Sequence, residues 1–301
     1  MSFIQKKNKP FTLVLSGGGA RGLAHIGILK QLEELNYIPS LIVGTSMGAV
    51  VGGMYAQLLS ASKVEEKTRN FIESDFFNQI GLEQFTDNSN DTTVSVWERF
   101  AAHLRSRYLL SKTVLGTGAF AQTTLLKSIN LLIDEMNIED LSIPFAAIAC
   151  DLKTGKEIIF TSGSVVNAVT ASSAVPGIVA PLELNGQLLV DGTVTSTIPI
   201  FSAKLLSKNP IVAVDVRKDL EKFENAQRGY EVILRSNEIT ARILNDLYLK
   251  DADVFLKPDV ADIKWNEFHT IDRCIQAGER AVKEKLPVLS KKLKKVFFSF
   301  S

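Results

Sequence analysis

A serine lies at the centre of a G-x-S-x-G pentapeptide: residues 44–48 read G-T-S-M-G, with Ser46 in the middle. An apolar run precedes the pentapeptide and a run of helical character follows it. That context predicts a strand, a sharp turn and a helix, with the serine hydroxyl at the apex of a nucleophile elbow. Gly44 and Gly48 let the backbone make the turn. The chemistry that such a serine could perform is nucleophilic attack on an acyl carbonyl.

A second glycine-rich turn, residues 17–22 with the sequence G-G-G-A-R-G, lies between an apolar run and a helix-like segment. The N–H groups of Gly17, Gly18 and Gly19 could stabilise the oxyanion that forms when a serine attacks an ester. A nucleotide phosphate loop is the alternative. A Walker loop would end in G-K-S/T, and a dinucleotide fingerprint would need an acidic residue closing the next strand. Arg21 could bind a phosphate headgroup or hold the loop in place, and we favour holding the loop.

A serine nucleophile needs a base that takes its proton. None of the three histidines (His25, His103 and His269) has a sequence context that marks it as a base. Asp191 is the better candidate because it ends an apolar strand and Gly192 follows it, and catalytic residues gather at strand ends in α/β sheets. An aspartate that merely closes a hairpin turn is the alternative interpretation.

The elements that must position these residues alternate between strand and helix. Strands are predicted over 11–16 and 41–44, and helices over 21–35 and 47–59. This order predicts parallel strands with helices on both faces. Further strands are expected over 144–150, 157–161, 182–184, 187–190, 211–216 and 254–256, and helices over 97–110, 122–132, 165–172, 227–249 and 272–285. Asn185-Gly186 is a hairpin signal, and 73–93 is expected to be a loop.

The composition limits the class of protein. The chain has 301 residues, of which 46% are hydrophobic and 22% charged, as in a folded globular protein. The net charge of +1 gives no basis for nucleic-acid binding. The two cysteines, Cys150 and Cys274, form no metal-type cluster, and this suits a reducing compartment. We expect a cytoplasmic protein, because residues 1–10 lack the apolar core of a signal peptide and no run is long enough to span a bilayer. We also expect no metal and no cofactor.

The chain is predicted to form one catalytic domain over 10–285 between a polar tail, 1–9, and a basic and aromatic tail, 286–301. Residues 73–120 are expected to form a cap segment. Contact with a membrane surface could come from 97–110, which we favour as a cap helix, or from 291–300, which combines lysines with phenylalanines. The alternatives for that tail are docking on the domain or pairing with a second subunit, which would give an oligomer.

Taken together, these motifs resemble the patatin-like phospholipase family. The resemblance rests on residues 17–22, on 44–48 and on Asp191-Gly192, which occur in the order of the family's motifs. Residues 150–155 and 171–177 also match the family's pattern, and the likeness extends from about 11 to about 216. It implies a three-layer α/β/α fold with a mostly parallel central sheet.

The resemblance also implies the roles of individual residues. Ser46 would be the nucleophile and Asp191 its base, with no catalytic histidine. Gly17, Gly18 and Gly19 would supply oxyanion donors together with the Met47 N–H. One position departs from the family, which usually has glycine or alanine where Thr193 follows the Asp-Gly pair. A hydroxyl there could narrow the pocket or bind the aspartate.

The expected function is a serine acyl hydrolase that cleaves carboxylic ester bonds of phospholipids or related lipids through an acyl-serine intermediate. A free aspartate has a pKa of about 3.9, so a base at neutral pH requires an apolar and dry site. Two alternatives remain open at this point: a carboxylesterase or thioesterase with small soluble substrates, and a non-catalytic lipid-binding regulatory module.

Overall fold

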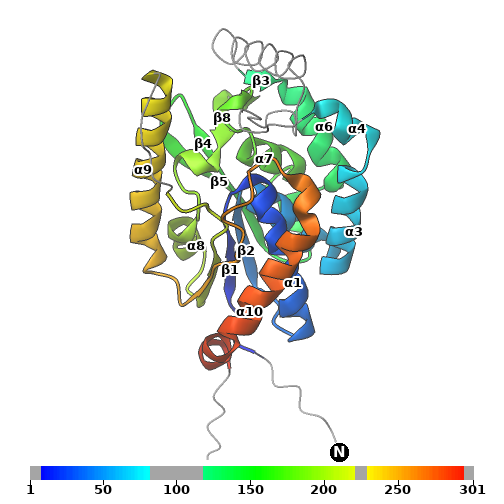
Figure 1. Cartoon of the computed structure of the whole chain (residues 1–301), viewed down its shortest axis with the longest axis vertical. Coiled ribbons are helices and arrows are strands. Elements are labelled where there is room, and N and C mark those ends of the chain that lie inside the picture. The colour runs from blue at the N-terminus through cyan, green and yellow to red at the C-terminus, as the bar shows by residue number, and fades with distance from the viewer. Residues whose placement is uncertain (1–7, 82–117, 221–228, 295–301) are drawn as a thin grey trace, which may run out of the picture.

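A computed structural model of the chain describes residues 8–81, 118–220 and 229–294. A sheet of eight strands lies between two layers of helices (Figure 1). The strand order is β10-β9-β1-β2-β4-β8-β7, and β5 pairs with β4. β10, β9, β1, β2 and β4 run parallel, whereas β8, β7 and β5 are antiparallel to their neighbours. The predicted three-layer fold with a mostly parallel sheet is confirmed.

The strands are β1 (Thr12–Leu15), β2 (Leu41–Thr45), β3 (Gly118–Phe120), β4 (Phe145–Asp151), β5 (Lys156–Phe160), β6 (Gly177–Val179), β7 (Leu182–Leu184), β8 (Gln187–Asp191), β9 (Ile211–Val214) and β10 (Val254–Leu256). The helices are α1 (Ala24–Glu34), α2 (Met47–Leu58), α3 (Ala61–Ile72), α4 (Asp75–Ile80), α6 (Gln122–Leu132), α7 (Val165–Ser172), α8 (Ile200–Leu206), α9 (Gly229–Leu249) and α10 (Ile271–Leu293). Short 3₁₀ turns occupy Gly19–Leu23, Ile138–Asp140, Gly192–Val194 and Phe268–Thr270. β3 and β6 form a separate parallel pair.

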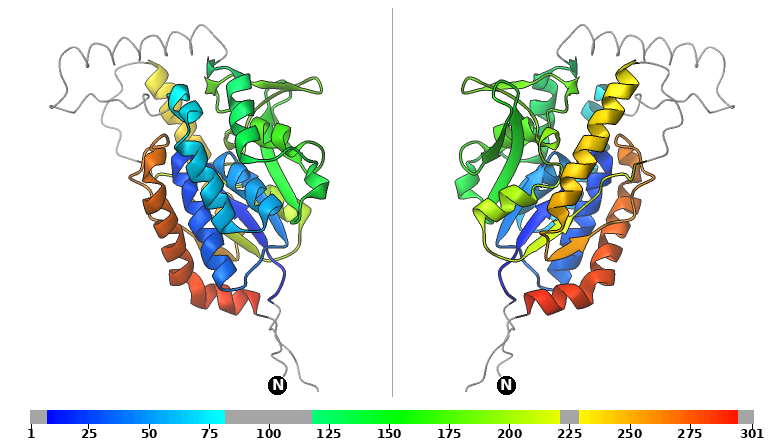
Figure 2. Two further views of the ribbon diagram at one scale, coloured as in Figure 1. Left: turned by 90° about the vertical axis from the view of Figure 1, so that its right-hand side faces the viewer. Right: turned by 90° about the vertical axis from the view of Figure 1, so that its left-hand side faces the viewer.

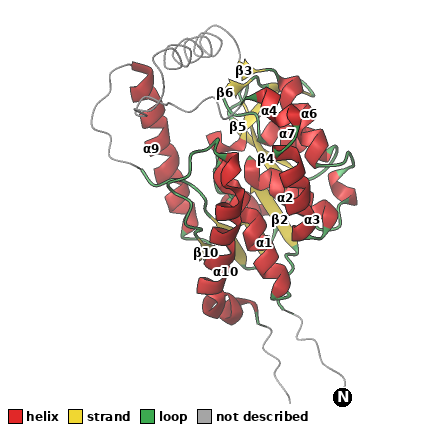
Figure 3. Ribbon diagram, turned by 45° about the vertical axis from the view of Figure 1, so that its right-hand side comes forward, coloured by secondary structure: helices red, strands yellow, loops and turns green. Residues whose placement is uncertain are grey.

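Alternating side chains of the central strands supply two cores, one on each face of the sheet. Leu13 and Leu15 of β1 join the larger core, which contains residues of α1, α2, α3, α7 and α10. Val14 points the other way, into a smaller core that includes residues of α8. Both faces of these strands are therefore buried, as expected for a parallel sheet covered by helices on both sides (Figures 2 and 3).

Several local predictions are confirmed to within a residue or two. α7 and β10 have the predicted bounds, and β7 and β8 form the predicted hairpin with Leu184 opposite Gln187. Asn185 and Gly186 have φ values of 50° and 79°. Two successive positive φ values are typical of the tight turn that Asn-Gly favours.

The predicted loop over 73–93 was wrong in its first part, where α4 forms. The Ser74 hydroxyl accepts a hydrogen bond from the Phe77 N–H and so caps this helix. Phe77 is buried and packs edge-on against Phe71 and Phe268, with ring centroids 5.4 and 5.3 Å apart. Contacts with residues far along the chain thus stabilise a helix that its short sequence does not predict. The predicted helix over 97–110 lies outside the described residues.

The last helix also differs from its prediction, because α10 continues past Lys285 and through Pro287 to Leu293. Leu289 and Leu293 are fully buried, and the Leu293 carbonyl accepts a hydrogen bond from the Lys9 N–H at 2.7 Å. This packing offsets the helix bond that proline removes, and α10 bends toward its C-terminal end (Figure 2). Leu286, Leu289 and Leu293 therefore pack against the core, and residues 295–301 lie outside the described part of the chain.

In the described ranges, no helix combines the length and the apolar character needed to cross a membrane.

Candidate active site

Ser46 lies at the sharp turn between β2 and α2. Its φ of 54° and ψ of −125° are unusual for a residue with a side chain. The turn brings backbone segments so close that a Cβ on Gly44 would collide with the Gly48 carbonyl, and a Cβ on Gly48 with the Leu15 carbonyl. Glycine at both positions is therefore a packing requirement. The Ser46 side chain stands where a parallel sheet commonly carries reactive groups, at the carboxyl end of a central strand.

The register of the sheet brings Asp191 close to Ser46. Thr45, at the end of β2, pairs with Ile148 of β4, and the next residue of β4, Ala149, pairs with Asp191 of β8. The serine and the aspartate thus meet across β4, although 145 positions separate them in the sequence. The chain beyond Asp191 then turns back over this edge, where the Thr45 hydroxyl donates to the Ser196 carbonyl at 3.0 Å.

The Asp191 carboxyl is fully buried, and burial raises its pKa to about 6. Interactions with the Ser46 hydroxyl and with Thr193 lower the pKa of Asp191, but burial has the larger effect. Oδ1 of Asp191 accepts the Thr193 N–H at 2.8 Å, whereas Oδ2 makes no hydrogen bond of ordinary geometry within the described residues. One carboxylate oxygen is thus held and the other is available to accept a proton.

The glycine turn after β1 has one N–H that is already engaged. The Gly17 N–H donates to the Thr197 carbonyl at 2.9 Å and is therefore engaged in this structure, while its part as an oxyanion donor stays a prediction. In the described structure, the N–H groups of Gly18, Gly19 and Met47 have no acceptor. Close packing requires glycine at position 17, because a Cβ there would lie 2.6 Å from Cγ2 of Thr193 and 3.2 Å from Cβ of Ser46.

Arg21 holds this glycine turn in place, the role that its sequence context favoured. Its Nε donates to the Val216 carbonyl at 3.1 Å and its Nη1 to the Ile263 carbonyl at 2.9 Å. Gly19, with a φ of 57°, packs so closely on the Trp265 backbone that a Cβ would overlap the carbonyl oxygen. The turn is thus fastened to segments more than 190 residues away in the sequence.

His25 behaves as a structural residue. Its ring is fully buried, and Nε2 lies 2.8 Å from the Ser16 carbonyl, to which it donates. Burial lowers the pKa of His25 to about 4, so the ring is neutral at physiological pH. His269 lies in the 3₁₀ turn Phe268–Thr270 before α10, and His103 lies outside the described residues.

Asp151, in one of the additional matching segments, also has a structural part. Its Oδ1 accepts the N–H groups of Lys153 and Leu188, and its Oδ2 accepts the Thr154 hydroxyl, at 2.8–3.1 Å. These bonds hold the turn between β4 and β5 against the β8 hairpin, and the Thr154 hydroxyl is the first cause of the lowered pKa of Asp151.

The side chains of two polar residues near the site accept hydrogen bonds from backbone N–H groups, and these contacts were not predicted. The Ser172 hydroxyl, at the end of α7, accepts the Ser46 N–H at 3.0 Å. Asn245 of α9 is buried, and its Oδ1 accepts the Ile198 N–H at 2.9 Å. Ser172 lies in the 171–177 run that matches the family, which was a signal for its importance. No local signal marked Asn245, because its partner is 47 residues away.

Replacing Ser172 with alanine is expected to lower both stability and turnover. The buried Ser46 N–H would lose its acceptor, at a cost of about 1–3 kcal/mol, and the strained Ser46 backbone would be held less well. Thermal unfolding and kcat on a soluble ester measure the two effects. Ser173→Ala is the matched control, because the Ser173 hydroxyl is buried with no partner in the described structure. Equal melting temperatures for Ser172→Ala and the unaltered protein would contradict this role.

A cavity of about 240 Å³ adjoins the glycine turn. Its lining includes Gly17 and Thr193, which lie beside Ser46, together with Gly18, Arg21, Arg217 and Arg242. A larger cavity of about 450 Å³ lies at the opposite edge of the sheet, where Leu41 and Phe145 begin β2 and β4. Ser46 follows the other end of β2, so the smaller cavity is the nearer of the two to this site, although Ser46 and Asp191 are not among its lining residues.

Comparison with known proteins identifies the family to which the chain is similar. The model of the patatin-like phospholipase family matches residues 13–204, which include the glycine turn, Ser46 and Asp191. An uncharacterized NTE family protein of Mycobacterium tuberculosis is 30% identical over 204 residues, which are 68% of this chain and 48% of that protein. Patatin-like phospholipase domain-containing protein 6 of Homo sapiens is 29% identical over 258 residues, 84% of this chain and 16% of that protein.

Among solved structures, VipD from Legionella pneumophila matches with a TM-score of 0.49 and 14% identity, over 95% of this chain and 67% of that one. The chain spans about half the length of the mycobacterial relative and less of the human one. The family model, by contrast, covers well over half of the chain. The chain therefore belongs to the patatin-like phospholipase family.

Proposed function

We propose that the chain hydrolyses carboxylic ester bonds of phospholipids or related lipids, with Ser46 as nucleophile and Asp191 as base. The observation that carries this proposal is the fully buried Asp191 carboxyl beside Ser46, with one oxygen held by Thr193 and the other making no hydrogen bond of ordinary geometry among the described residues. A carboxyl with a pKa of about 6 is partly protonated near neutral pH, so it can both take and return a proton.

In the proposed first half-reaction, Ser46 Oγ attacks the ester carbonyl carbon while its proton passes to Asp191 Oδ2. The carbonyl oxygen becomes an oxyanion, for which the N–H groups of Gly18, Gly19 and Met47 are the available donors. Collapse of this intermediate breaks the bond to the leaving alcohol, which takes the proton from Asp191. The product is an acyl-serine.

The second half-reaction reverses the sequence with water. Asp191 takes a proton from a water molecule as its oxygen attacks the acyl-serine carbonyl, and the same N–H groups bind the second oxyanion. Collapse releases the free fatty acid, and the proton returns from Asp191 to Ser46 Oγ. No group outside the dyad has to move a proton, which agrees with the structural contacts of His25.

Thr193 fits this mechanism although the family usually has a smaller residue there. Its N–H binds Oδ1 of Asp191 and its side chain also lowers the pKa of that carboxyl. Both contacts orient the aspartate instead of blocking it. The non-catalytic lipid-binding module rests on Thr193 alone and is therefore the weaker alternative.

An ester panel tests the proposal and separates it from the soluble-ester alternative. We expect kcat/KM to increase along a p-nitrophenyl series from acetate to decanoate, and we expect fatty acid release from phospholipids in mixed micelles. A fluorophosphonate probe should label Ser46, as mapped by mass spectrometry of the digested protein. Labelling without lipid turnover would favour the carboxylesterase or thioesterase, and the absence of both would favour the non-catalytic module.

Contact with a membrane surface stays a prediction. The first candidate segment, 97–110, lies outside the described residues. In the second, 291–300, Leu293 is buried in the core and Lys292 forms an ion pair with Asp253 at 3.1 Å. Leu293 is thus unavailable to a bilayer, and the aromatic residues of that segment lie beyond the described part. The predicted cytoplasmic location likewise stays a prediction.

A further inference from the structure

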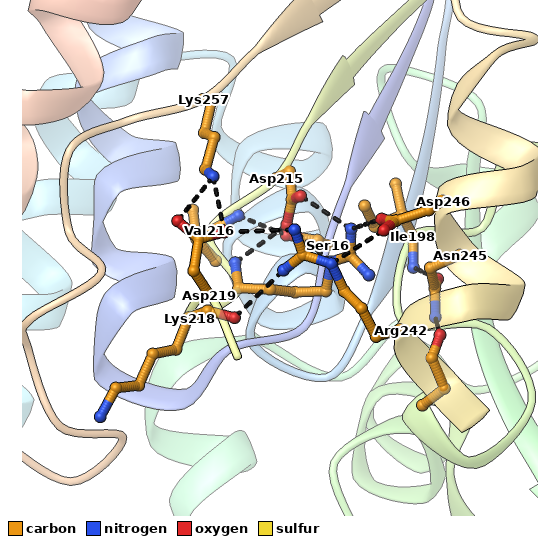
Figure 4. A network of polar contacts seen from close by, with 12 residues as sticks. Ser16, Ile198, Asp215, Val216, Lys218, Asp219, Arg242, Asn245, Asp246 and Lys257 are labelled. Atoms are coloured by element: carbon orange, nitrogen blue, oxygen red, sulfur yellow. Dashed lines mark hydrogen bonds and ion pairs between the residues drawn. The ribbon is translucent and has the colours of Figure 1, made fainter. Parts of the chain in front are cut away.

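The cavity beside the proposed oxyanion donors is basic. One residue of its lining, Glu238, is acidic. Four residues of the lining are basic: Arg21, Arg217, Lys218 and Arg242. Gly18 and Thr193 also line the cavity, so it borders one of the proposed oxyanion donors and the residue that binds Asp191. Figure 4 shows the polar network that includes Arg242 of the cavity lining: Arg242 of α9 donates to Asp219, and Asn245 of α9 accepts from Ile198.

Arg217 is held rigidly and still has unused donors. Its side chain is only 10% exposed. Nε and Nη2 donate to the two oxygens of Asp215 at 2.9 Å each, and Nη2 also contacts Asp246 at 3.0 Å. Nη1 is buried and has no acceptor within the described residues. Since buried donors in folded proteins nearly always have a partner, this nitrogen indicates an acceptor that the described residues do not supply.

The neighbouring arginines add positive charge. Arg21 donates only to backbone carbonyls, and no carboxylate in the described structure forms an ion pair with it. Arg242 is fixed by Asp246 and Asp219, at 2.9 and 3.2 Å, while it also borders the cavity. The guanidinium groups are thus pre-positioned, which lowers the entropy lost when they bind an anion.

We propose that this cavity binds the phosphate of a phospholipid headgroup, with Nη1 of Arg217 donating to a phosphate oxygen. Guanidinium groups match phosphate in charge and in hydrogen-bond geometry. A phosphate on the alcohol side of the ester would fill the cavity while the ester carbonyl reaches Gly18. Arg217 then selects phosphate-bearing esters over neutral acylglycerols. This inference rests on the proposed ester hydrolysis at Ser46.

Two esters that differ only in the phosphate test the inference. They are 1-octanoylglycerol and 1-octanoylglycerol 3-phosphate, used as monomers below their micelle concentrations. We expect the unaltered protein to have a kcat/KM at least tenfold higher on the phosphate ester. Arg217→Gln should reduce this ratio about tenfold. Arg273→Gln is the matched control, because Arg273 is half exposed, pairs with Asp262 and lies outside the cavity wall, so the ratio should stay unchanged.

Loss of folding must be separated from loss of binding, since Arg217→Gln leaves the buried Asp215 charge without its partner. The double variant Asp215→Asn/Arg217→Gln removes both charges, and it should show the same reduced ratio with a melting temperature near that of the unaltered protein. A folded double variant that keeps the full phosphate preference would overturn the inference.

The source of the phosphate is distinguished by binding. Glycerol 3-phosphate should bind the Ser46→Ala protein in a calorimetric titration, and more tightly than inorganic phosphate. Equal binding of the two compounds, or binding of inorganic phosphate alone, would mean a site for free anions and would overturn the headgroup assignment. The absence of binding by both compounds would overturn it as well. Binding of glycerol 3-phosphate without hydrolysis of either ester would instead contradict the proposed catalytic function and leave the headgroup site intact.

Discussion

The Ser46→Ala protein is expected to lose ester hydrolysis by at least about 10⁴-fold, because alanine has no oxygen to form the acyl-enzyme. The same substitution should abolish labelling by a fluorophosphonate. Rates of fatty acid release under initial-rate conditions measure the loss. Ser236→Ala is a suitable control, because Ser236 is exposed on α9 and its hydroxyl donates only to the Val232 carbonyl within that helix.

A glycine at the same position separates the chemistry from the backbone. Ser46→Gly should be equally inactive but more stable than Ser46→Ala, since glycine adopts the φ of 54° with less strain. The difference should be about 1 kcal/mol in the free energy of unfolding. Near-normal hydrolysis by either variant would contradict a nucleophilic Ser46.

Asp191→Asn should lose most of its activity and, above pH 6, should be more stable than the unaltered protein. The amide cannot accept the Ser46 proton, and loss of a general base typically costs 10²–10⁴-fold, so about 10³-fold is expected here. Its oxygen can still accept the Thr193 N–H, so the local fold should be kept. In the unaltered protein, kcat/KM should rise with pH through a midpoint near 6, because only the ionised carboxylate acts as base.

The gain in stability follows from the raised pKa of Asp191. Its ordinary pKa of 3.8 becomes about 6 in the folded protein, so the folded state binds a proton more tightly than the unfolded chain. The contribution of this group is most favourable below about pH 4 and is lost as the pH rises through 6. The loss at pH 8 is about 3 kcal/mol, at 1.36 kcal/mol per pKa unit.

Asn at position 191 avoids the cost of ionising the carboxyl, so the variant should melt at a higher temperature than the unaltered protein at pH 8 but not at pH 4. Thermal unfolding of both proteins at the two pH values tests the sign. A less stable variant at pH 8 would mean that the Asp191 carboxylate is better solvated than its burial indicates.

The amino-acid sequence by itself determined the local features of the site. The Gly-x-Ser-x-Gly turn, the glycine turn after β1 and the Asn185-Gly186 hairpin were predictable because glycine and asparagine relieve steric limits within a few residues. The alternation of apolar segments likewise predicted the layered fold. α3 and α8 were not predicted, and α10 continues through Pro287 because distant packing outweighs the local penalty.

Only the tertiary structure decided which of these groups meet and which donors are free. Asp191 reaches Ser46 through the register of β2 and β8 on either side of β4. Gly17 loses its N–H to Thr197, and Arg217 is oriented by a buried Asp215. Local sequence chemistry sets the shape of a turn, but hydrogen-bond partners and burial depend on segments that come together only on folding. These segments set the pKa of Asp191 and place the arginines around the cavity.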